Sequence, residues 1–231
     1  MSEQGLAKRV RVWDLPTRVF HWALVLCVVG SVISAKVGGN AMVWHMRLGY
    51  AVLALVGFRV LWGLVGGRWS RFSSFFYSPA AFLRYLRGRA LPGDHFDVGH
   101  NPLGALSVLA MLVWLLVQVG SGLIADDEIA TTGPLIAWVS GDLSLAWTAY
   151  HKSYGQWGLL ALVGLHVLAI AFYRLRQRKD LIGPMLSGDK QLSSHIPASQ
   201  DSLATRLFAL TLLAACLAGV YLLINVAPPG V

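Results

Sequence analysis

Long runs of apolar residues, separated by shorter polar stretches, dominate the sequence. They cover residues 17–35, 44–65, 103–125, 150–173 and 206–226. Each run is close to the length of about 20 residues that an α-helix needs to cross a bilayer. The first run follows basic residues, but its length and its polar residues favour a spanning helix over a cleaved signal peptide. The pattern therefore predicts an all-α membrane protein with five spanning helices.

The composition supports this prediction. Of the 231 residues, 56% are hydrophobic and only 13% are charged. Soluble domains carry about 25% charged residues, so this chain has too little polar surface to be a soluble enzyme or a disordered chain. Its two cysteines cannot form a disulfide framework.

The distribution of basic residues predicts the orientation of the chain, because Lys and Arg concentrate in cytoplasmic connections. With the N-terminus in the cytoplasm and the C-terminus in the periplasm, sixteen of the 19 basic residues lie on the inner side. The connection between the third and fourth spans lies outside and carries acidic residues, namely Asp126, Asp127, Glu128 and Asp142. The net charge of +8 is therefore a topology signal that predicts contact with membrane lipid and excludes nucleic acid.

The inner connection 66–100 alternates aromatic residues with arginines. This pattern predicts an amphipathic helix that lies in the membrane interface, beginning near Pro79 and ending near Gly88.

Four of the seven histidines lie within or at the edge of predicted spans: His21, His45, His151 and His166. Ionisable residues are rare inside spans and are usually functional, although a single histidine can equally bond a carbonyl of a neighbouring helix. His151 and His166 share one span, about 22 Å apart along the axis and about 60° apart around it. In the predicted topology His21 and His166 lie at similar depth near the inner face, and His45 and His151 lie near the outer face. The spacing predicts two histidine pairs stacked across the bilayer.

A buried pair of neutral imidazoles is a suitable axial ligand set for haem iron. Structural zinc sites use four ligands, and no carboxylate accompanies either pair, so zinc fits less well. We therefore predict an inner haem between His21 and His166 and an outer haem between His45 and His151. Some basic side chains near these depths can pair with haem propionates or extend to lipid headgroups. They are Arg18, Arg47 and Lys152.

The other histidines carry weaker signals. His95 and His100 precede the third span, and a histidine at this interface can move a proton to or from a quinone. The alternative is an ordinary helix start, with Asn101 as the N-cap and Pro102 at the first helical position. His195 lies in a polar stretch with no predicted role.

Two motifs resemble those of the prokaryotic cytochrome b-561 family, which includes the membrane cytochrome b subunits of nickel–iron hydrogenases. The first is Val12-Trp13-Asp14-Leu15-Pro16-Thr17-Arg18-Val19-Phe20-His21-Trp22, and the second is Gly99-His100-Asn101-Pro102-Leu103-Gly104. The fourth span of this chain, with two widely spaced histidines, is also similar to that of the family. The resemblance covers about residues 8–180.

This resemblance implies a four-helix transmembrane bundle over 8–180 that holds two b haems. The implied haem ligands are the same four histidines that their depth in the predicted topology indicates. A polar linker (181–203) and an additional C-terminal transmembrane helix (204–231) would follow. The family's members pass electrons, in the bacterial inner membrane, between quinone and a partner at the outer face. The resemblance thus implies a quinone site near His100 and a periplasmic partner such as a cytochrome c or a hydrogenase-type subunit.

Other functions remain as alternatives. A superoxide:quinone oxidoreductase can use the same scaffold, but the outer face carries three basic and four acidic residues, which does not favour an anion funnel. A cofactor-free transporter or scaffold subunit accounts for the spans and gives no reason for histidines at matched depths. Whether the protein is an enzyme or an electron-transfer subunit therefore stays open from the sequence.

Overall fold

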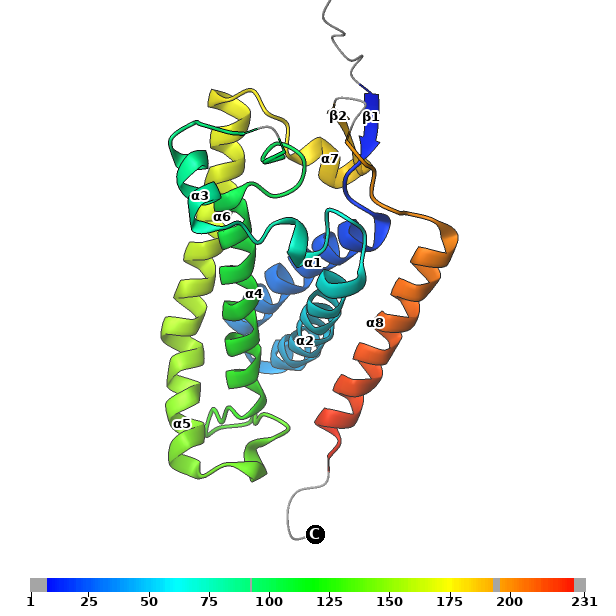
Figure 1. The fold of residues 1–231 in the computed structure, drawn as a ribbon. Coiled ribbons are helices and arrows are strands. Elements are labelled where there is room, and N and C mark those ends of the chain that lie inside the picture. Colours follow the sequence, from blue (N-terminus) through cyan, green and yellow to red (C-terminus); the bar gives the residue numbers. More distant parts are fainter. Residues whose placement is uncertain (1–7, 92, 193–195, 227–231) are drawn as a thin grey trace, which may run out of the picture. The chain divides into compact units, whose positions relative to one another are not determined.

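The computed structural model describes residues 8–91, 93–192 and 196–226 (Figure 1). His195 lies outside the described residues. The chain divides into two compact units. The first unit comprises the described residues of Met1–Phe20, Arg59–Leu109 and His166–Leu210. The second unit comprises those of His21–Phe58, Ala110–Leu165 and Thr211–Val231.

Five long apolar helices are present among the described residues, as the hydrophobic pattern predicts. Four of them are α1 (Leu15–Val37), α2 (Met42–Val65), α4 (Pro102–Leu123) and α8 (Leu203–Ile224). Their ends lie within three residues of the predicted ones. Large apolar side chains such as Leu26 and Leu222 are exposed along them, as expected for surfaces that face lipid.

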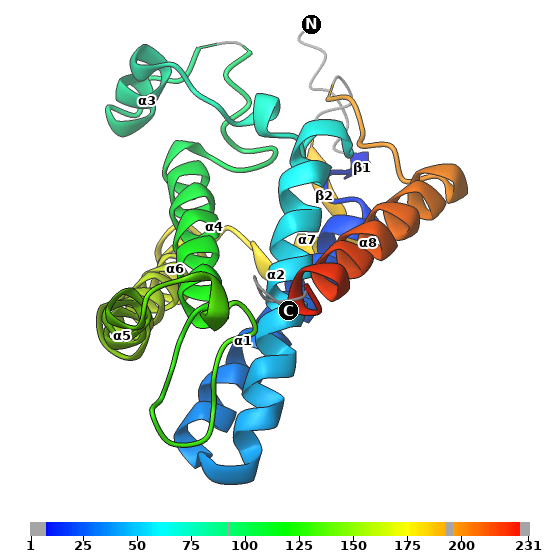
Figure 2. The same cartoon turned by 90° about the horizontal axis from the view of Figure 1, so that it is seen from below.

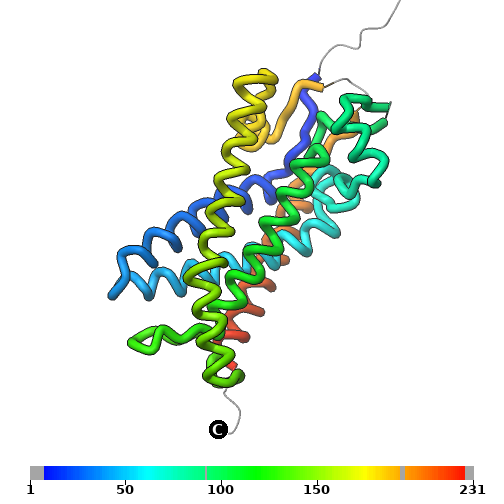
Figure 3. Tube along the Cα trace, turned by 90° about the vertical axis from the view of Figure 1, so that its left-hand side faces the viewer, coloured from blue at the N-terminus to red at the C-terminus, as the bar shows by residue number. Residues whose placement is uncertain are grey.

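The fourth spanning helix is longer than predicted and contains a π turn. Helix α5 (Gly141–Tyr150) runs into a single π-helical segment, η4 (His151–Gly155), and then into α6 (Gln156–Arg176), as the continuous trace in Figure 3 shows. Ser140 begins α5 as its N-cap, with its hydroxyl accepting from the backbone N–H of Leu143. The helix therefore begins nine residues before the apolar run that predicted it.

In the second unit, α1 and α2 form an antiparallel hairpin through the short 3-10 helix η1 (Gly39–Ala41), as Figure 2 shows. Gly38 and Gly39 both have positive φ, of 68° and 53°, a conformation that other residues rarely adopt. The connection between α4 and α5 contains the 3-10 helix η3 (Ile136–Trp138) and an isolated bridge between Asp126 and Thr132.

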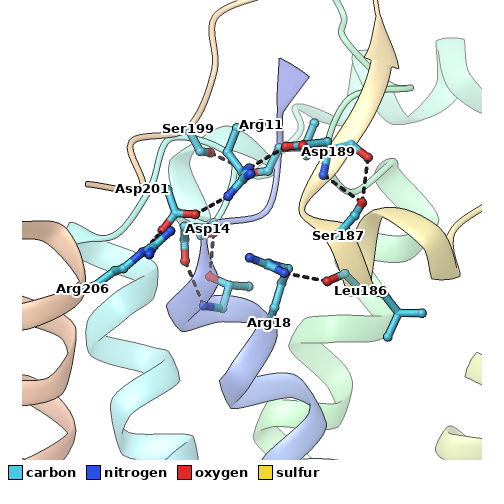
Figure 4. Close-up of polar contacts among 12 residues, drawn as sticks. Arg11, Asp14, Arg18, Leu186, Ser187, Asp189, Ser199, Asp201 and Arg206 are labelled. Atoms are coloured by element: carbon cyan, nitrogen blue, oxygen red, sulfur yellow. Dashed lines mark hydrogen bonds and ion pairs between the residues drawn. The ribbon is translucent and has the colours of Figure 1, made fainter. Parts of the chain in front are cut away.

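In the first unit, a small antiparallel ribbon pairs strand β1 (Lys8–Arg11) with strand β2 (Asp189–Leu192), preceded by helix α7 (Ile182–Ser187). Arg11 forms ion pairs of 2.5 Å with both Asp189 and Asp201, and Arg206 pairs with Asp201 at 2.9 Å (Figure 4). These contacts link the start of the chain to the connection before α8. The sequence pattern predicts neither the ribbon nor α7 within the polar segment 181–203.

The N-terminal motif of the chain caps α1. Asp14 is fully buried and accepts hydrogen bonds from the backbone N–H of Thr17 (2.8 Å), Trp62 Nε1 (3.1 Å) and Ser70 Oγ (2.6 Å). A Cβ on Gly67 would lie 2.3 Å from the Asp14 carboxylate, so a larger residue would not fit there. The motif thus fixes the start of α1 against α2 and the connection that follows it.

The connection between α2 and α4 contains the 3-10 helix η2 (Phe72–Ser74) and helix α3 (Pro79–Leu86). Ser78 is the N-cap of α3, Pro79 is its first residue, and Gly88 follows its end with φ of 65°. Ala81 is buried while Leu83 and Leu86 are exposed. The helix lies where the aromatic and basic pattern predicts it.

Candidate haem site

The imidazoles of His45 and His151 lie together in the second unit. Their ring centroids are 5.9 Å apart and the ring planes are perpendicular, at 90°. His45 lies in the first turn of α2, and His151 is the first residue of the π turn. The structure thus brings together the two residues of the predicted outer pair.

Both rings are oriented by hydrogen bonds to backbone carbonyls. His45 Nδ1 lies 2.9 Å from the carbonyl oxygen of Ser31 in α1. His151 Nδ1 lies 2.9 Å from the carbonyl oxygen of Gln118 in α4, and 2.9 Å from Ser121 Oγ. Because a carbonyl oxygen can only accept, each Nδ1 carries the proton and Nε2 has the free lone pair. This arrangement is the usual one for a metal-ligating histidine, whose other ring nitrogen donates to a carbonyl or carboxylate.

The π turn at His151 is held by side chains of α4. A π turn interrupts the regular α-helical ladder, and such turns are frequent at functional sites. Gln118 Nε2 donates to the carbonyl oxygen of His151 (3.1 Å), and Trp114 Nε1 donates to that of Gly155 (2.8 Å). Trp114 and Gln118 are four residues apart and so lie on one face of α4. That face therefore positions both the backbone and the ring of His151.

Glycines allow the close approach of α4 to this turn. A Cβ on Gly122 would lie 3.1 Å from Cε1 of His151, and a Cβ on Gly158 would lie 1.9 Å from the Trp114 ring. These two glycines therefore serve helix packing and ring placement. Gly49, one turn after His45, differs because a Cβ there would meet no atom within 4 Å.

The donor set suits haem iron better than a free metal ion. Within the residues that the structure describes, no group of three or more His, Cys, Asp or Glu side chains could hold a metal ion. Two opposed imidazoles are sufficient for haem iron, because the porphyrin supplies the remaining ligands. The residues present therefore fit a bis-histidine haem.

The other two predicted ligands lie in different units. His21 is in the α1 segment of the second unit, with its ring edge-on to Trp22 at 5.1 Å. His166 is in the α6 segment of the first unit. Both side chains are half-buried, and their pairing stays a prediction.

The three basic residues predicted near the haem depths have different surroundings. Arg47 lies over the Trp44 ring at 5.3 Å, and Lys152 is exposed within the π turn. Arg18 Nη1 donates to the carbonyl oxygen of Leu186 at 2.6 Å (Figure 4). The Nε atom of Arg18 is buried and has no acceptor among the described residues.

Arg59 is a buried cation that was not predicted as a site residue. It is 3% exposed, and its guanidinium lies 5.0 Å from the centre of the Phe72 ring. Within the described part of the chain, its Nη1 atom has no hydrogen-bond acceptor. The nearby Asp14 carboxylate already accepts three hydrogen bonds from other groups. Its position, six residues before the end of the apolar run 44–65, is the sequence signal that could have identified it as a candidate.

His100 lies in the first unit, where its ring contacts two aromatic rings, those of Trp13 (4.7 Å between centroids) and Phe75 (4.8 Å). Its carbonyl oxygen accepts from the hydroxyl of Tyr77 at 2.6 Å. Asn101 Oδ1 accepts from the backbone N–H of Gly104, which confirms the predicted N-cap of α4. Burial raises the pKa of Tyr77 to about 12, so this hydroxyl stays a donor at physiological pH.

The acidic connection between α4 and α5 forms an ordered turn. Asp127 Oδ1 accepts from the backbone N–H groups of Ile129, Ala130 and Thr131, at 3.0, 2.9 and 2.8 Å. These bonds lower the pKa of Asp127 to about 2. Ile129, at the tip of the turn, is 90% exposed. The charge of Asp127 therefore orders the turn.

An all-α membrane protein with an oriented pair of half-buried imidazoles has the architecture of a membrane-bound b-type cytochrome. Comparison with known proteins identifies the family: the sequence model of "Prokaryotic cytochrome b561" matches residues 12–188, and the chain belongs to this family. The protein is therefore a multi-pass membrane cytochrome of electron transport that carries b-type haem.

Several curated relatives are each named "Probable Ni/Fe-hydrogenase B-type cytochrome subunit". That of Bradyrhizobium diazoefficiens is 26% identical, over 79% of this chain and 86% of the relative. Those of Azotobacter chroococcum and Rhodobacter capsulatus are 29% and 23% identical, over 81% and 78% of this chain and 91% and 81% of each relative. No solved structure gives a significant match.

Proposed function

We propose that the protein binds two b haems and moves electrons across the membrane between quinone and a partner at the periplasmic face. The observation that carries this proposal is the His45–His151 pair, with ring centroids 5.9 Å apart and both Nδ1 atoms donating to backbone carbonyls. This pair would hold the outer haem through its Nε2 atoms. The bound iron supplies one-electron redox chemistry, and the protein supplies axial ligands, burial and position.

The inner haem would be held by His21 and His166. The support is the sequence, since both residues lie at similar depth in the predicted topology. Arg18 and Arg59 would bind its propionates, because both have a buried guanidinium nitrogen without an acceptor among the described residues. An unpaired buried cation is costly, and a carboxylate that accepts from it would offset much of that cost.

Quinone would bind near His100, and the imidazole would exchange protons with it. The ring already contacts those of Trp13 and Phe75, and aromatic side chains of this kind suit a flat quinone head. With the N-terminus in the cytoplasm, this site would lie at the inner face of the bacterial inner membrane, and the His45–His151 pair at the outer face.

The partner at the outer face would be a hydrogenase-type subunit, on the basis of the relatives' names. A soluble cytochrome c is the alternative, since the outer connection is acidic and cytochromes of this kind are often basic. Ile129 at the exposed tip of that connection would be available to either partner.

Substitution of His100 tests the quinone step. We expect His100→Ala to retain both haems and to slow haem reduction by a quinol in stopped-flow experiments, by about 100-fold, the range of a lost general acid–base group. The carbonyl bond to Tyr77 uses the backbone, so the substitution leaves it in place. His95→Ala is the matched control and should reduce at the wild-type rate. Equal rates in His100→Ala and wild type would contradict the quinone assignment, and loss of a haem would make His100 a ligand instead.

A further inference from the structure

A cavity of about 560 Å³ lies in the first unit, away from the histidine pair. Three segments form it: 68–77 after α2, 93–95 in the loop before α4, and 198–200 before α8. Trp69 fixes two of these segments together, because its Nε1 donates to the Pro197 carbonyl (2.8 Å) and its backbone N–H donates to Ser199 Oγ (3.2 Å). The cavity is therefore part of the packed fold.

The lining of this cavity favours an anion. Arg68 and Arg71 contribute guanidinium groups, and Ser73, Ser74 and Gln200 contribute further polar groups. Toward the described residues, the Arg71 side chain donates only through its Nε, to the carbonyl oxygen of Gly66 at 2.7 Å. Its terminal nitrogens are therefore available in the fork geometry that matches a phosphate.

The carboxylate in the cavity wall is already neutralised. Asp94 forms an ion pair of 2.6 Å with Arg84 and also accepts from the backbone N–H of Leu91 (2.8 Å). The pair with Arg84 lowers the pKa of Asp94 and keeps it ionised. Among the described residues, Arg68 and Arg71 have no ion-pair partner and thus remain as unneutralised charges.

Apolar surface lies next to these charges. Phe76, which lines the cavity, is 63% exposed. Leu83 and Leu86 of α3 are exposed as well, on the helix that the sequence predicts to lie in the membrane interface. The cavity also follows directly on the end of α2, a spanning helix. A charged cavity beside an apolar surface at a membrane interface fits a ligand with a phosphate head and acyl chains.

We propose that this cavity binds the phosphate headgroup of an anionic phospholipid. Arg68 and Arg71 would hold the phosphate, Ser73 would donate a hydrogen bond to it, and the acyl chains would extend past Phe76. Basic pockets on the cytoplasmic side of membrane proteins bind such headgroups. This site does not depend on the haem ligands or on the quinone step.

The test uses the full-length protein, purified in a neutral detergent, and an Arg68→Gln/Arg71→Gln variant. Native mass spectrometry would measure the phosphatidylglycerol that stays bound, and titration with phosphatidylglycerol in mixed micelles would measure affinity. We expect the variant to bind phosphatidylglycerol about tenfold more weakly or worse, since each lost hydrogen bond from a charged group costs about that factor. Circular dichroism and gel filtration would confirm that the variant is folded.

A matched control removes two arginines that do not line the cavity. Arg87 and Arg89 are exposed and follow α3, so Arg87→Gln/Arg89→Gln makes the same change in net charge on the same connection. We expect this control to bind phosphatidylglycerol as the wild type does. An equal loss in the control would show diffuse surface attraction and would overturn the proposal, as would wild-type binding by the Arg68→Gln/Arg71→Gln variant.

Two further experiments identify the source of the phosphate and provide a second variant in case the first does not fold. Inorganic phosphate alone, at millimolar concentration, should not compete with phosphatidylglycerol; if it does so, the cavity is a site for soluble phosphate and the lipid proposal is wrong. Should the double glutamine variant fail to fold, Ser73→Leu would block the cavity while keeping both charges, and it should lose the lipid to a similar extent. Retention of the lipid by a folded Ser73→Leu variant would contradict the proposal.

Discussion

The ring planes of His45 and His151 are perpendicular, with 5.9 Å between their centroids. This relationship follows from the two carbonyls that fix the rings, those of Ser31 in α1 and Gln118 in α4. Each carbonyl belongs to a helix other than the one that carries its histidine. The orientation of the pair is therefore set by the packing of neighbouring helices, which is how a preorganised metal site is supported.

The perpendicular arrangement predicts an electronic signature. Axial ligands set the electronic properties of haem iron, and perpendicular imidazole planes leave two of its d orbitals nearly equal in energy. We expect the oxidised outer haem to give a low-spin electron paramagnetic resonance signal with a strongly anisotropic g tensor. Loss of that signal in His151→Ala would assign it to this pair. A nearly rhombic signal from the outer haem would show parallel planes and contradict the geometry.

Gly122 is expected to be required for the outer haem. A Cβ there lies 3.1 Å from the His151 ring, so Gly122→Val would displace the imidazole. Overpacking of this kind costs about 1–3 kcal/mol. Haem content and the reduced spectrum would report the loss of the outer haem. The control is Gly120→Val on the same helix, where a Cβ meets no atom within 4 Å; an equal effect of both substitutions would show that helix propensity, not ring contact, is responsible.

Arg59 is expected to tune one haem. If its guanidinium pairs with a propionate, Arg59→Met removes a buried positive charge that favours the reduced, more negative form of the haem. The midpoint potential of that haem should therefore fall, by on the order of tens of millivolts. Redox titration followed by visible spectroscopy measures this shift. Arg174→Met, at an exposed position, is the control, and unchanged potentials in Arg59→Met would exclude the propionate contact.

The turn at Asp127 is expected to depend on pH in a defined direction. The pKa of this carboxyl is about 2 in the folded protein, below its ordinary value of about 3.9. A depressed pKa means that the stabilisation is complete above about pH 4 and is lost as the pH falls toward 2. Hydrogen exchange at the amides of Ile129, Ala130 and Thr131 should accordingly stay slow from pH 7 to pH 4, after correction for intrinsic rates.

Neutralising substitutions test the same turn at constant pH. Asp127→Asn should raise exchange at those three amides by about tenfold, because it loses charge-assisted hydrogen bonds. Glu128→Gln makes the same change in charge without touching those bonds and should leave exchange unchanged. Equal exchange in Asp127→Asn and wild type would show that the carboxylate does not order the turn.

Much of this architecture could be predicted from the sequence, because apolar run length and the period of the pattern are local properties. The five spanning helices, the start of α3 at Pro79 and the N-cap at Asn101 are confirmed. The depth of each histidine in the predicted topology also paired His45 with His151, and the structure places these two residues together. The assignment of His21 and His166 to one pair stays a prediction.

Other features depend on contacts between distant segments, and sequence patterns do not report those. The β1–β2 ribbon joins residues about 180 positions apart in the chain. The π turn at His151 is stabilised by Trp114 and Gln118 of another helix. The predicted positions of His151 and His166 assume a regular α-helix, and that regular geometry is interrupted at this turn. The burial of Arg59 likewise arises from packing against Phe72 in the connection after α2.

Haem content in matched histidine variants shows directly whether the protein holds two haems and whether His45 and His151 bind one of them. Pyridine haemochrome analysis of the purified wild type should give two b haems per chain, and His45→Ala and His151→Ala should each give one. The same remaining haem should be present in both variants, with an unchanged midpoint potential, and His95→Ala should keep both. A wild type with one haem or none, or full haem content in His45→Ala and His151→Ala, would contradict the account.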